Sequence, residues 1–227
     1  CYTRESGVRV LERNLAAVCR KTAKRIALGE CKSVQLRAGS VANYLGPARF
    51  EPEHVYAQDE VGLVRGLAWT SVGGEVLDVE VAVLDGTGKL ELTGNLGNVM
   101  KESAQAAVTY IRSRAQLLGI DPEFYKNKDI HIHFPEGAVP KDGPSAGITM
   151  ATAMLSAVTG KKVCASVAMT GEITLRGRVL PIGGLKEKTL AARMAHMKKV
   201  LVPDKNRPDM AEISNCLLYT SDAADDR

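Results

Sequence analysis

Residues 130–160 read IHIHFPEGAVPKDGPSAGITMATAMLSAVTG. The apolar residues in its first part alternate with His131 and His133, a pattern that predicts a strand with one buried face. The Gly- and Pro-rich run at 135–147 predicts a loop. The apolar segment that follows ends near Gly160 and predicts a helix. This stretch therefore predicts a strand, an irregular loop and a helix in direct succession.

Strands and helices are interspersed through the chain from residue 62 to residue 202. An apolar stripe at helical spacing predicts a helix at 96–118, which Gly119 ends and Pro122 keeps from resuming. Strands are predicted at 62–70, 75–84, 89–93, 163–170, 173–180 and 199–202, and a further helix at about 185–197. Because these elements do not follow a regular βαβ alternation, we expect the α+β class rather than a doubly wound sheet.

The first fifty residues have a different texture. Apolar residues at spacings of three and four predict a helix at 5–28, with Gly29 as its stop. A short strand is predicted at 32–37, followed by a loop around Gly46. The polar and acidic run EPEHVYAQDE at 51–60 is the best candidate for a linker.

Composition narrows the class of protein. The chain has 227 residues, of which 45% are hydrophobic and 25% charged, as in ordinary globular proteins. Its net charge of +4 comes without a long basic run, so DNA binding is unsupported. No apolar run is long enough to span a membrane. The five cysteines lack metal-ligand spacing and are expected to be free thiols. Since the chain opens at Cys1, it is expected to be a piece of something longer.

Ser145 lies where the predicted loop becomes a helix. Gly and Pro shape the loop, and small neighbours would let a substrate backbone approach the hydroxyl. The positive end of the helix and its backbone N–H groups would stabilise an oxyanion there. The alternative is that Ser145 only caps the helix.

A serine nucleophile needs a base. His131 or His133 would serve in a Ser-His-Asp triad, and a lysine stripped of water would serve instead. Asp142 would orient such a partner or be an ordinary turn residue. The residues alone leave these alternatives open. A Ser-x-x-Lys amidase is excluded because Ile148 stands where that motif requires lysine.

The run from Pro135 to Lys188 resembles the Lon protease family. The serine signature of that family, Asp-Gly-Pro-Ser-Ala-Gly, stands at 142–147, and MTGEITLRGRVLPIGGLKEK at 169–188 is also similar. The resemblance extends through GLAWTSVGGE at 66–75, and residues 2–50 resemble the end of the family's ATPase module. It implies a helical remnant of that module at 1–50, a linker at 51–60 and a proteolytic domain at 61–213.

The resemblance assigns roles at the site. Ser145 would be the nucleophile, Lys188 the general base, and Thr170 would position the lysine amine. Further polar groups expected around the site are Glu80, His131, His133, Asp142 and Glu172, of which the last would otherwise be a solvated turn residue. A zinc site at the two histidines lacks a third ligand with sensible spacing, so no metal is expected.

Arg9 resembles the arginine with which such ATPase modules sense nucleotide, a role it would have only in the intact enzyme. Because no GxxxxGK[ST] loop occurs in the sequence, no cofactor is expected for this chain itself. ATP and Mg²⁺ would act in the intact enzyme. The family resemblance further implies a homo-hexamer that degrades unfolded or tagged proteins in the bacterial cytoplasm, or alternatively in the mitochondrial matrix.

An ATP-independent peptidase and a non-catalytic scaffold of the same family are the alternatives to an ATP-driven protease. Residues 214–227 no longer resemble the family and are expected to be a foreign or truncated tail.

Of the two lysines near the start of the predicted helix, Lys188 shares a small apolar face with Leu185, Ala192 and Ala195. Lys186 shares a more mixed face with Leu190, Arg193 and Met197.

Overall fold

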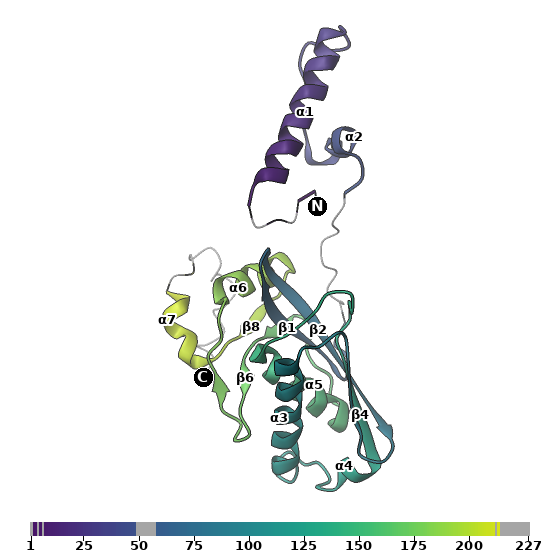
Figure 1. Ribbon diagram of the computed structural model, residues 1–227, viewed down its shortest axis with the longest axis vertical. Coiled ribbons are helices and arrows are strands. Elements are labelled where there is room, and N and C mark those ends of the chain that lie inside the picture. Colours follow the sequence, from purple (N-terminus) through teal and green to yellow (C-terminus); the bar gives the residue numbers. More distant parts are fainter. Residues whose placement is uncertain (1, 4, 6, 49–57, 212, 214–227) are drawn as a thin grey trace. The chain divides into compact units, whose positions relative to one another are not determined.

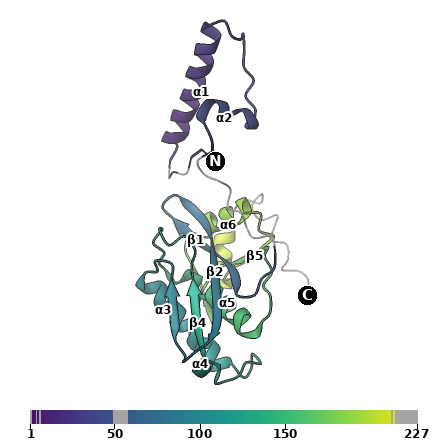
Figure 2. The same cartoon turned by 90° about the vertical axis from the view of Figure 1, so that its right-hand side faces the viewer.

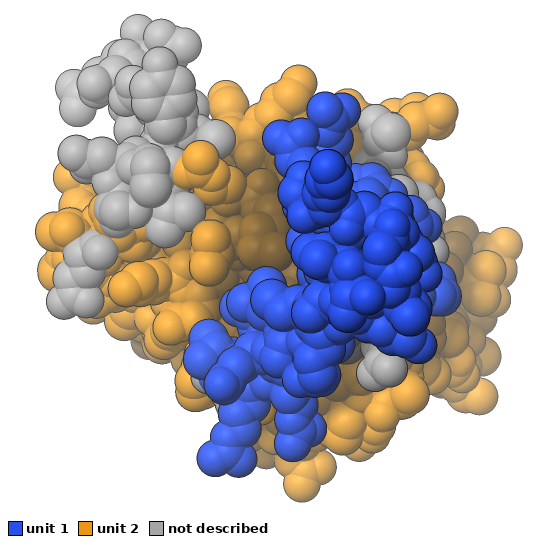
Figure 3. All heavy atoms as spheres, turned by 90° about the horizontal axis from the view of Figure 1, so that it is seen from above, with its two compact units in different colours: residues 1–54 blue, residues 55–227 orange. Residues whose placement is uncertain are grey.

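The computed structural model describes residues 2–3, 5, 7–48, 58–211 and 213. The chain divides into two compact units, residues 1–54 and 55–227 (Figure 3). The division falls inside the predicted linker at 51–60, most of which lies outside the described residues. Asp59 and Glu60 already belong to the second unit: Asp59 accepts the N–H of Ala165 at 2.7 Å, and Glu60 pairs with Val163.

The first unit is built on helix α1, Arg9–Ala27, followed by the short helices η1, Ala38–Ser40, and α2, Ala42–Leu45 (Figure 1). The predicted start at residue 5 is wrong, because Glu5 caps the helix from outside. Its carboxylate accepts the N–H groups of Val10 and Leu11 at 2.8 and 2.9 Å, which have no partner within the helix. Gly29 ends α1 as predicted, with φ of 74°.

The strand predicted at 32–37 is wrong as well. These residues form no strand, and the described part of the first unit contains none with which they could pair. An isolated extended segment has unsatisfied backbone groups, and alternating side chains alone do not stabilise it.

The second unit contains a six-stranded sheet in the order β3-β4-β2-β1-β5-β8. The strands are β1 Leu63–Thr70, β2 Gly73–Asp85, β3 Leu90–Thr93, β4 Lys128–His133, β5 Val167–Met169 and β8 Lys199–Leu201. β2 pairs antiparallel with β1 and with β4, whereas β3–β4, β1–β5 and β5–β8 are parallel. This mixed sheet with interspersed helices confirms the α+β prediction.

Helices cover both faces of the sheet (Figures 1 and 2). On one face lie α3, Asn98–Arg114, and α5, Gly147–Thr159; on the other lies α6, Leu185–Met194. Alternation along the strands decides which side chains meet which helix. Val79 packs with the α3–α5 side, whereas Leu67 of β1 and Ala168 of β5 pack with Ala192 of α6.

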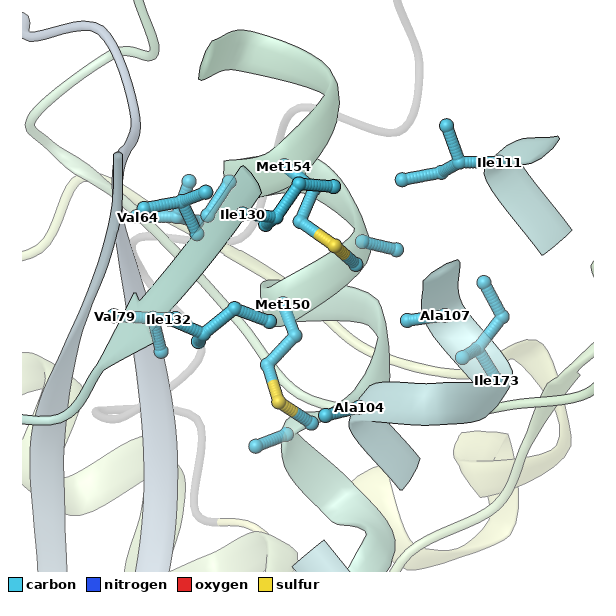
Figure 4. Packing of buried hydrophobic residues seen from close by; sticks show 14 of the residues in the cluster. Val64, Val79, Ala104, Ala107, Ile111, Ile130, Ile132, Met150, Met154 and Ile173 are labelled. Carbon is cyan, nitrogen blue, oxygen red and sulfur yellow. The ribbon is translucent and has the colours of Figure 1, made fainter. Parts of the chain in front are cut away.

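The main core lies between the sheet and α3 (Figure 4). Met150 and Met154 of α5 sit in its centre, with isoleucines of β4 on one side and alanines of α3 on the other. The small side chains of Ala104 and Ala107 let the two helices approach closely. Methionine fills the irregular space between them because its side chain is unbranched and adaptable.

Several predicted boundaries shift for local reasons. The helix predicted to reach residue 197 ends at Met194, because His196 has φ of 58° and reverses the chain. The N–H of Met197 then donates to Ala192 C=O at 2.9 Å, the closing bond of a Schellman motif. The single strand predicted at 173–180 is a hairpin, β6 Glu172–Ile173 with β7 Val179–Leu180, which turns at Gly177.

The remaining short helices are α4, Phe124–Asn127, η2, Pro144–Ala146, η3, Asp204–Asn206, and α7, Arg207–Met210.

Cys19, Cys31 and Cys164 are free thiols, and the other two cysteines lie outside the described residues. Among the helices that the structure describes, none has the length and apolar character needed to cross a membrane.

Candidate active site

Ser145 lies in η2, directly before α5, where the Gly- and Pro-rich loop becomes a helix. Its main chain is tied to the segment that follows β5. Its C=O accepts the N–H of Gly171 at 2.8 Å and the hydroxyl of Thr170 at 3.3 Å. Thr170 comes one residue after β5 ends, so Ser145 is held at the carboxyl end of β5, the strand next to the edge strand β8.

Lys188 reaches the same place from the first turn of α6. Its Nζ donates to Ser145 Oγ at 3.0 Å and to Thr170 Oγ1 at 3.1 Å. Only 2% of Lys188 and 1% of Thr170 is exposed to solvent. Burial disfavours the charged ammonium and lowers the pKa of Lys188 from 10.5 to about 8. A substantial share of the lysine is therefore neutral slightly above physiological pH.

Gly74 allows α6 to come close enough for this contact. The backbone of Glu187 lies against Gly74 of β2, and a Cβ at position 74 would overlap the Glu187 carbonyl. Leu185, Ala191 and Ala192 are buried on the same side of α6. The sheet thus sets the position of the helix that carries Lys188.

The two lysines of this helix have different environments, as their predicted faces indicated. Lys188 is buried together with Leu185, Ala192 and Ala195, whereas Lys186 is exposed. The assignment of Met197 to the mixed face of Lys186 is wrong. Met197 is buried, because it follows the reversal at His196 and folds back against the sheet.

Asp142 connects the serine loop to α3. Its Oδ1 accepts the N–H groups of Met100 at 3.0 Å and Gly143 at 2.9 Å. Its carboxyl group lies against Gly97, where a Cβ would have no room. Within the described residues its hydrogen bonds go to the main chain and not to Lys188. These hydrogen bonds are those of a turn residue, and Asp142 also lines the cavity that contains Ser145 and Lys188.

Ser145 and Lys188 line a cavity of about 530 Å³. One wall is the end of β1, Leu67–Trp69, and another is the loop Pro181–Gly184 that precedes α6. Trp69, which lies in no recognised catalytic motif of the sequence, is 61% exposed and packs its ring against Gly184. It is the sole tryptophan of the chain, which is the one signal for it in the sequence. A large aromatic side chain beside a serine site is suited to substrate contact.

The other predicted site residues lie elsewhere. Glu80, His131 and His133 do not line the cavity but share the opposite sheet face from the main core, where Thr93 Oγ1 contacts both histidine rings at 2.8 and 2.7 Å. Glu172 is half-buried in β6 and does not line the cavity either. Arg9 is exposed in the first turn of α1, in the other unit. Across the described ranges, no group of three His, Cys, Asp or Glu side chains is arranged to hold a metal ion.

Two family models match the chain. Residues 35–220 match the Lon protease (S16) C-terminal proteolytic domain, and residues 1–34 match the Lon protease AAA+ ATPase lid domain. The first match extends into 214–220, beyond the point where the sequence suggested that the resemblance stops.

Similar curated proteins carry the same family name. The chain is 57% identical to a Lon protease of Desulforamulus reducens over 212 aligned residues. The aligned region makes up 93% of the chain and 26% of that relative. It is 59% identical to a Lon protease of Bacillus thuringiensis and 56% identical to Lon protease 1 of Bacillus subtilis, each over 93% of the chain and 27% of the relative. The chain thus spans about a quarter of the length of these relatives. With a family model covering most of its residues and relatives of this identity, the chain belongs to the Lon protease family.

Proposed function

We propose that the second unit is a serine endopeptidase in which Ser145 is the nucleophile and Lys188 the general base. The observation that carries the proposal is the 3.0 Å contact between Lys188 Nζ and Ser145 Oγ, with the amine buried and its pKa lowered to about 8. A base must lie within hydrogen-bond reach of the proton that it removes and must titrate near the working pH. Lys188 satisfies both conditions.

In the proposed reaction, the neutral Lys188 amine takes the proton of the Ser145 hydroxyl as Oγ attacks the carbonyl carbon of the peptide bond. The Thr170 hydroxyl accepts from Nζ and donates to Ser145 C=O, which fixes the direction of the amine. The resulting lysine ammonium then protonates the leaving amine. A water molecule, deprotonated by the regenerated neutral lysine, hydrolyses the acyl-enzyme and releases Ser145.

The oxyanion of the tetrahedral intermediate would be stabilised at the start of α5. Ser145 lies two residues before the first residue of this helix, whose positive end favours a negative charge nearby. The Asp142 carboxylate does not compete at this place, because it is held by Met100 and Gly143.

We further propose that this peptidase belongs to an ATP-driven protease of unfolded, damaged or tagged proteins, acting as a homo-hexamer in the bacterial cytoplasm. The match of residues 1–34 to an ATPase lid supports the ATP-driven form over an ATP-independent peptidase. Presence of both Ser145 and Lys188 argues against a non-catalytic scaffold. ATP and Mg²⁺ would bind a phosphate loop that this sequence does not contain, with Arg9 sensing the nucleotide in the intact enzyme.

Labelling with a small fluorophosphonate, followed by mapping of the modified residue, tests the nucleophile. We expect the adduct on Ser145, and Ser145→Ala should abolish both labelling and peptide cleavage. If Ser145→Ala still cleaves an unfolded protein at a tenth of the parent rate, the assignment is wrong. Degradation of a folded substrate by this chain alone, stimulated by ATP, would contradict the proposed division between peptidase and ATPase.

A further inference from the structure

The loop Pro181–Gly184 forms one wall of the cavity, and its last residue, Gly184, lies against the ring of Trp69. None of its four residues is buried. At its end, Gly184 C=O accepts the N–H of Lys188 at 3.0 Å, which joins the loop to α6. A wall of this kind, exposed and without a buried side chain, needs another anchor to keep its shape.

Asn206 supplies that anchor from a distant part of the chain. Its Oδ1 accepts the N–H of Ile182 at 3.0 Å, and its Nδ2 donates to the C=O of the same residue at 2.8 Å. Only 2% of Asn206 is exposed. One buried side-chain amide therefore satisfies both main-chain groups at the centre of the loop.

The position of Asn206 is itself fixed. It ends η3, and its N–H donates to the C=O of Pro203 at 2.9 Å. Pro203 is buried two residues after β8, the strand that pairs with β5. Because β5 leads directly to Thr170, the anchor and the catalytic groups are supported by the same edge of the sheet.

The two hydrogen bonds between Asn206 and Ile182, called the clamp below, act at the centre of the cavity wall. Pro181, Ile182, Gly183 and Gly184 all line the cavity, so the clamp holds a segment in which every residue borders the space for a peptide.

We infer that Asn206 is a positioning residue, which acts through Ile182 to hold the Pro181–Gly184 wall for an extended peptide substrate. It contacts neither Ser145 nor Lys188, and α6 is held independently by its packing on the sheet. Loss of the clamp should therefore weaken the binding of peptides while leaving the reactivity of Ser145 intact. This inference rests on the proposed peptidase function.

Two covalent probes separate these effects. A small fluorophosphonate reports the reactivity of Ser145, whereas a tripeptidyl diphenyl phosphonate must also lie along the loop wall. We expect Asn206→Ala and the volume-conserving Asn206→Leu to lower the second-order rate of the tripeptidyl probe about tenfold. The second-order rate of the small probe should change by less than about twofold. Peptide cleavage should show the loss in KM and not in kcat.

Asp209→Ala is the matched control, because it removes a side-chain partner of Asn206 Nδ2 and leaves the two hydrogen bonds to Ile182 in place. It should leave both probe rates unchanged. An equal loss for both probes in Asn206→Leu, or no loss for the tripeptidyl probe, would overturn the inference. Failure of the small probe to label Ser145 in the parent chain would instead refute the proposed function.

Hydrogen exchange of the parent chain tests the clamp without any substitution. The Ile182 amide should be protected, although its loop is exposed, and the tripeptidyl probe should add protection at Gly183. Exchange of Ile182 as fast as an open loop amide would overturn the inference even if the Asn206 variants fail to fold.

Discussion

The amine of Lys188 lies 3.0 Å from the hydroxyl of Ser145, although 43 residues separate them in the chain. Ser145 precedes α5 and is held by the segment after β5. Lys188 lies on α6, which packs on the sheet face opposite to α5. The two side chains meet at Thr170, just beyond the carboxyl end of β5.

Lys188→Ala and Lys188→Arg should both remove peptide cleavage, because the first deletes the amine and the second introduces a group that cannot release its proton. Lys186→Ala should retain most activity, because Lys186 is exposed. Rates on one fluorogenic peptide decide the assignment. An inactive Lys186→Ala beside an active Lys188→Ala would reverse it.

Peptide cleavage should rise with pH through a midpoint near 8. Only the neutral amine acts as base, and burial lowers the pKa of Lys188 to about 8, so the active fraction grows as pH increases through that value. The profile of kcat/KM against pH, measured from 6 to 10 with a peptide that does not titrate, provides the test. A profile that stays flat between pH 7 and 9 would exclude Lys188 as the base.

Lys188→Met should make the chain more stable at neutral pH. The folded pKa of about 8 lies below the unfolded value of 10.5. The unfolded state therefore binds a proton more readily, and folding free energy is lost as pH falls from 10.5 to 8. Methionine removes that penalty, which is at most roughly 3 kcal/mol. The two lost hydrogen bonds of the amine reduce the gain.

Urea unfolding of parent and variant at several pH values measures this effect. The gain in stability should be largest below pH 8 and should fall by the full proton penalty as pH approaches 10.5. Lys186→Met is the control and should show no such pH dependence, because Lys186 is exposed. A Lys188→Met chain whose relative stability increases toward high pH would contradict the sign of the argument.

Gly74→Ala should displace α6 and lower the cleavage rate. The added Cβ would overlap the Glu187 carbonyl, and a helix backbone cannot move aside without carrying Lys188 away from Ser145. We expect a loss of stability of about 1–3 kcal/mol from overpacking and a fall in kcat. Gly137→Ala is the matched control, because its Cβ would meet only ordinary van der Waals contact. Equal activity of the two variants would show that α6 does not depend on Gly74.

Local signals were sufficient for most of the second unit. Alternation at 130–134 and the apolar stripe at 96–118 correspond to β4 and α3, because tertiary packing reinforces what the periodicity predicts. The hairpin at 172–180 was predicted as one strand. Its turn depends on a glycine of positive φ, which the apolar pattern around it concealed. In the first unit, the strand at 32–37 failed because no partner strand is present among the described residues to satisfy its backbone.

The sequence by itself determined the α+β class, the family and the preference for Lys188 over Lys186, since a helical stripe of small apolar residues identifies the buried lysine. Only the tertiary structure decided which polar groups surround Ser145. Glu80, His131 and His133 share a sheet face with Leu67 and Trp69, which line the cavity, yet these three residues lie further along their strands and do not line it. Trp69, Gly74 and Asn206 were not predicted, because their roles come from close approach between segments far apart in the chain. Periodicity reports which face of an element is buried, but it does not report what that face meets.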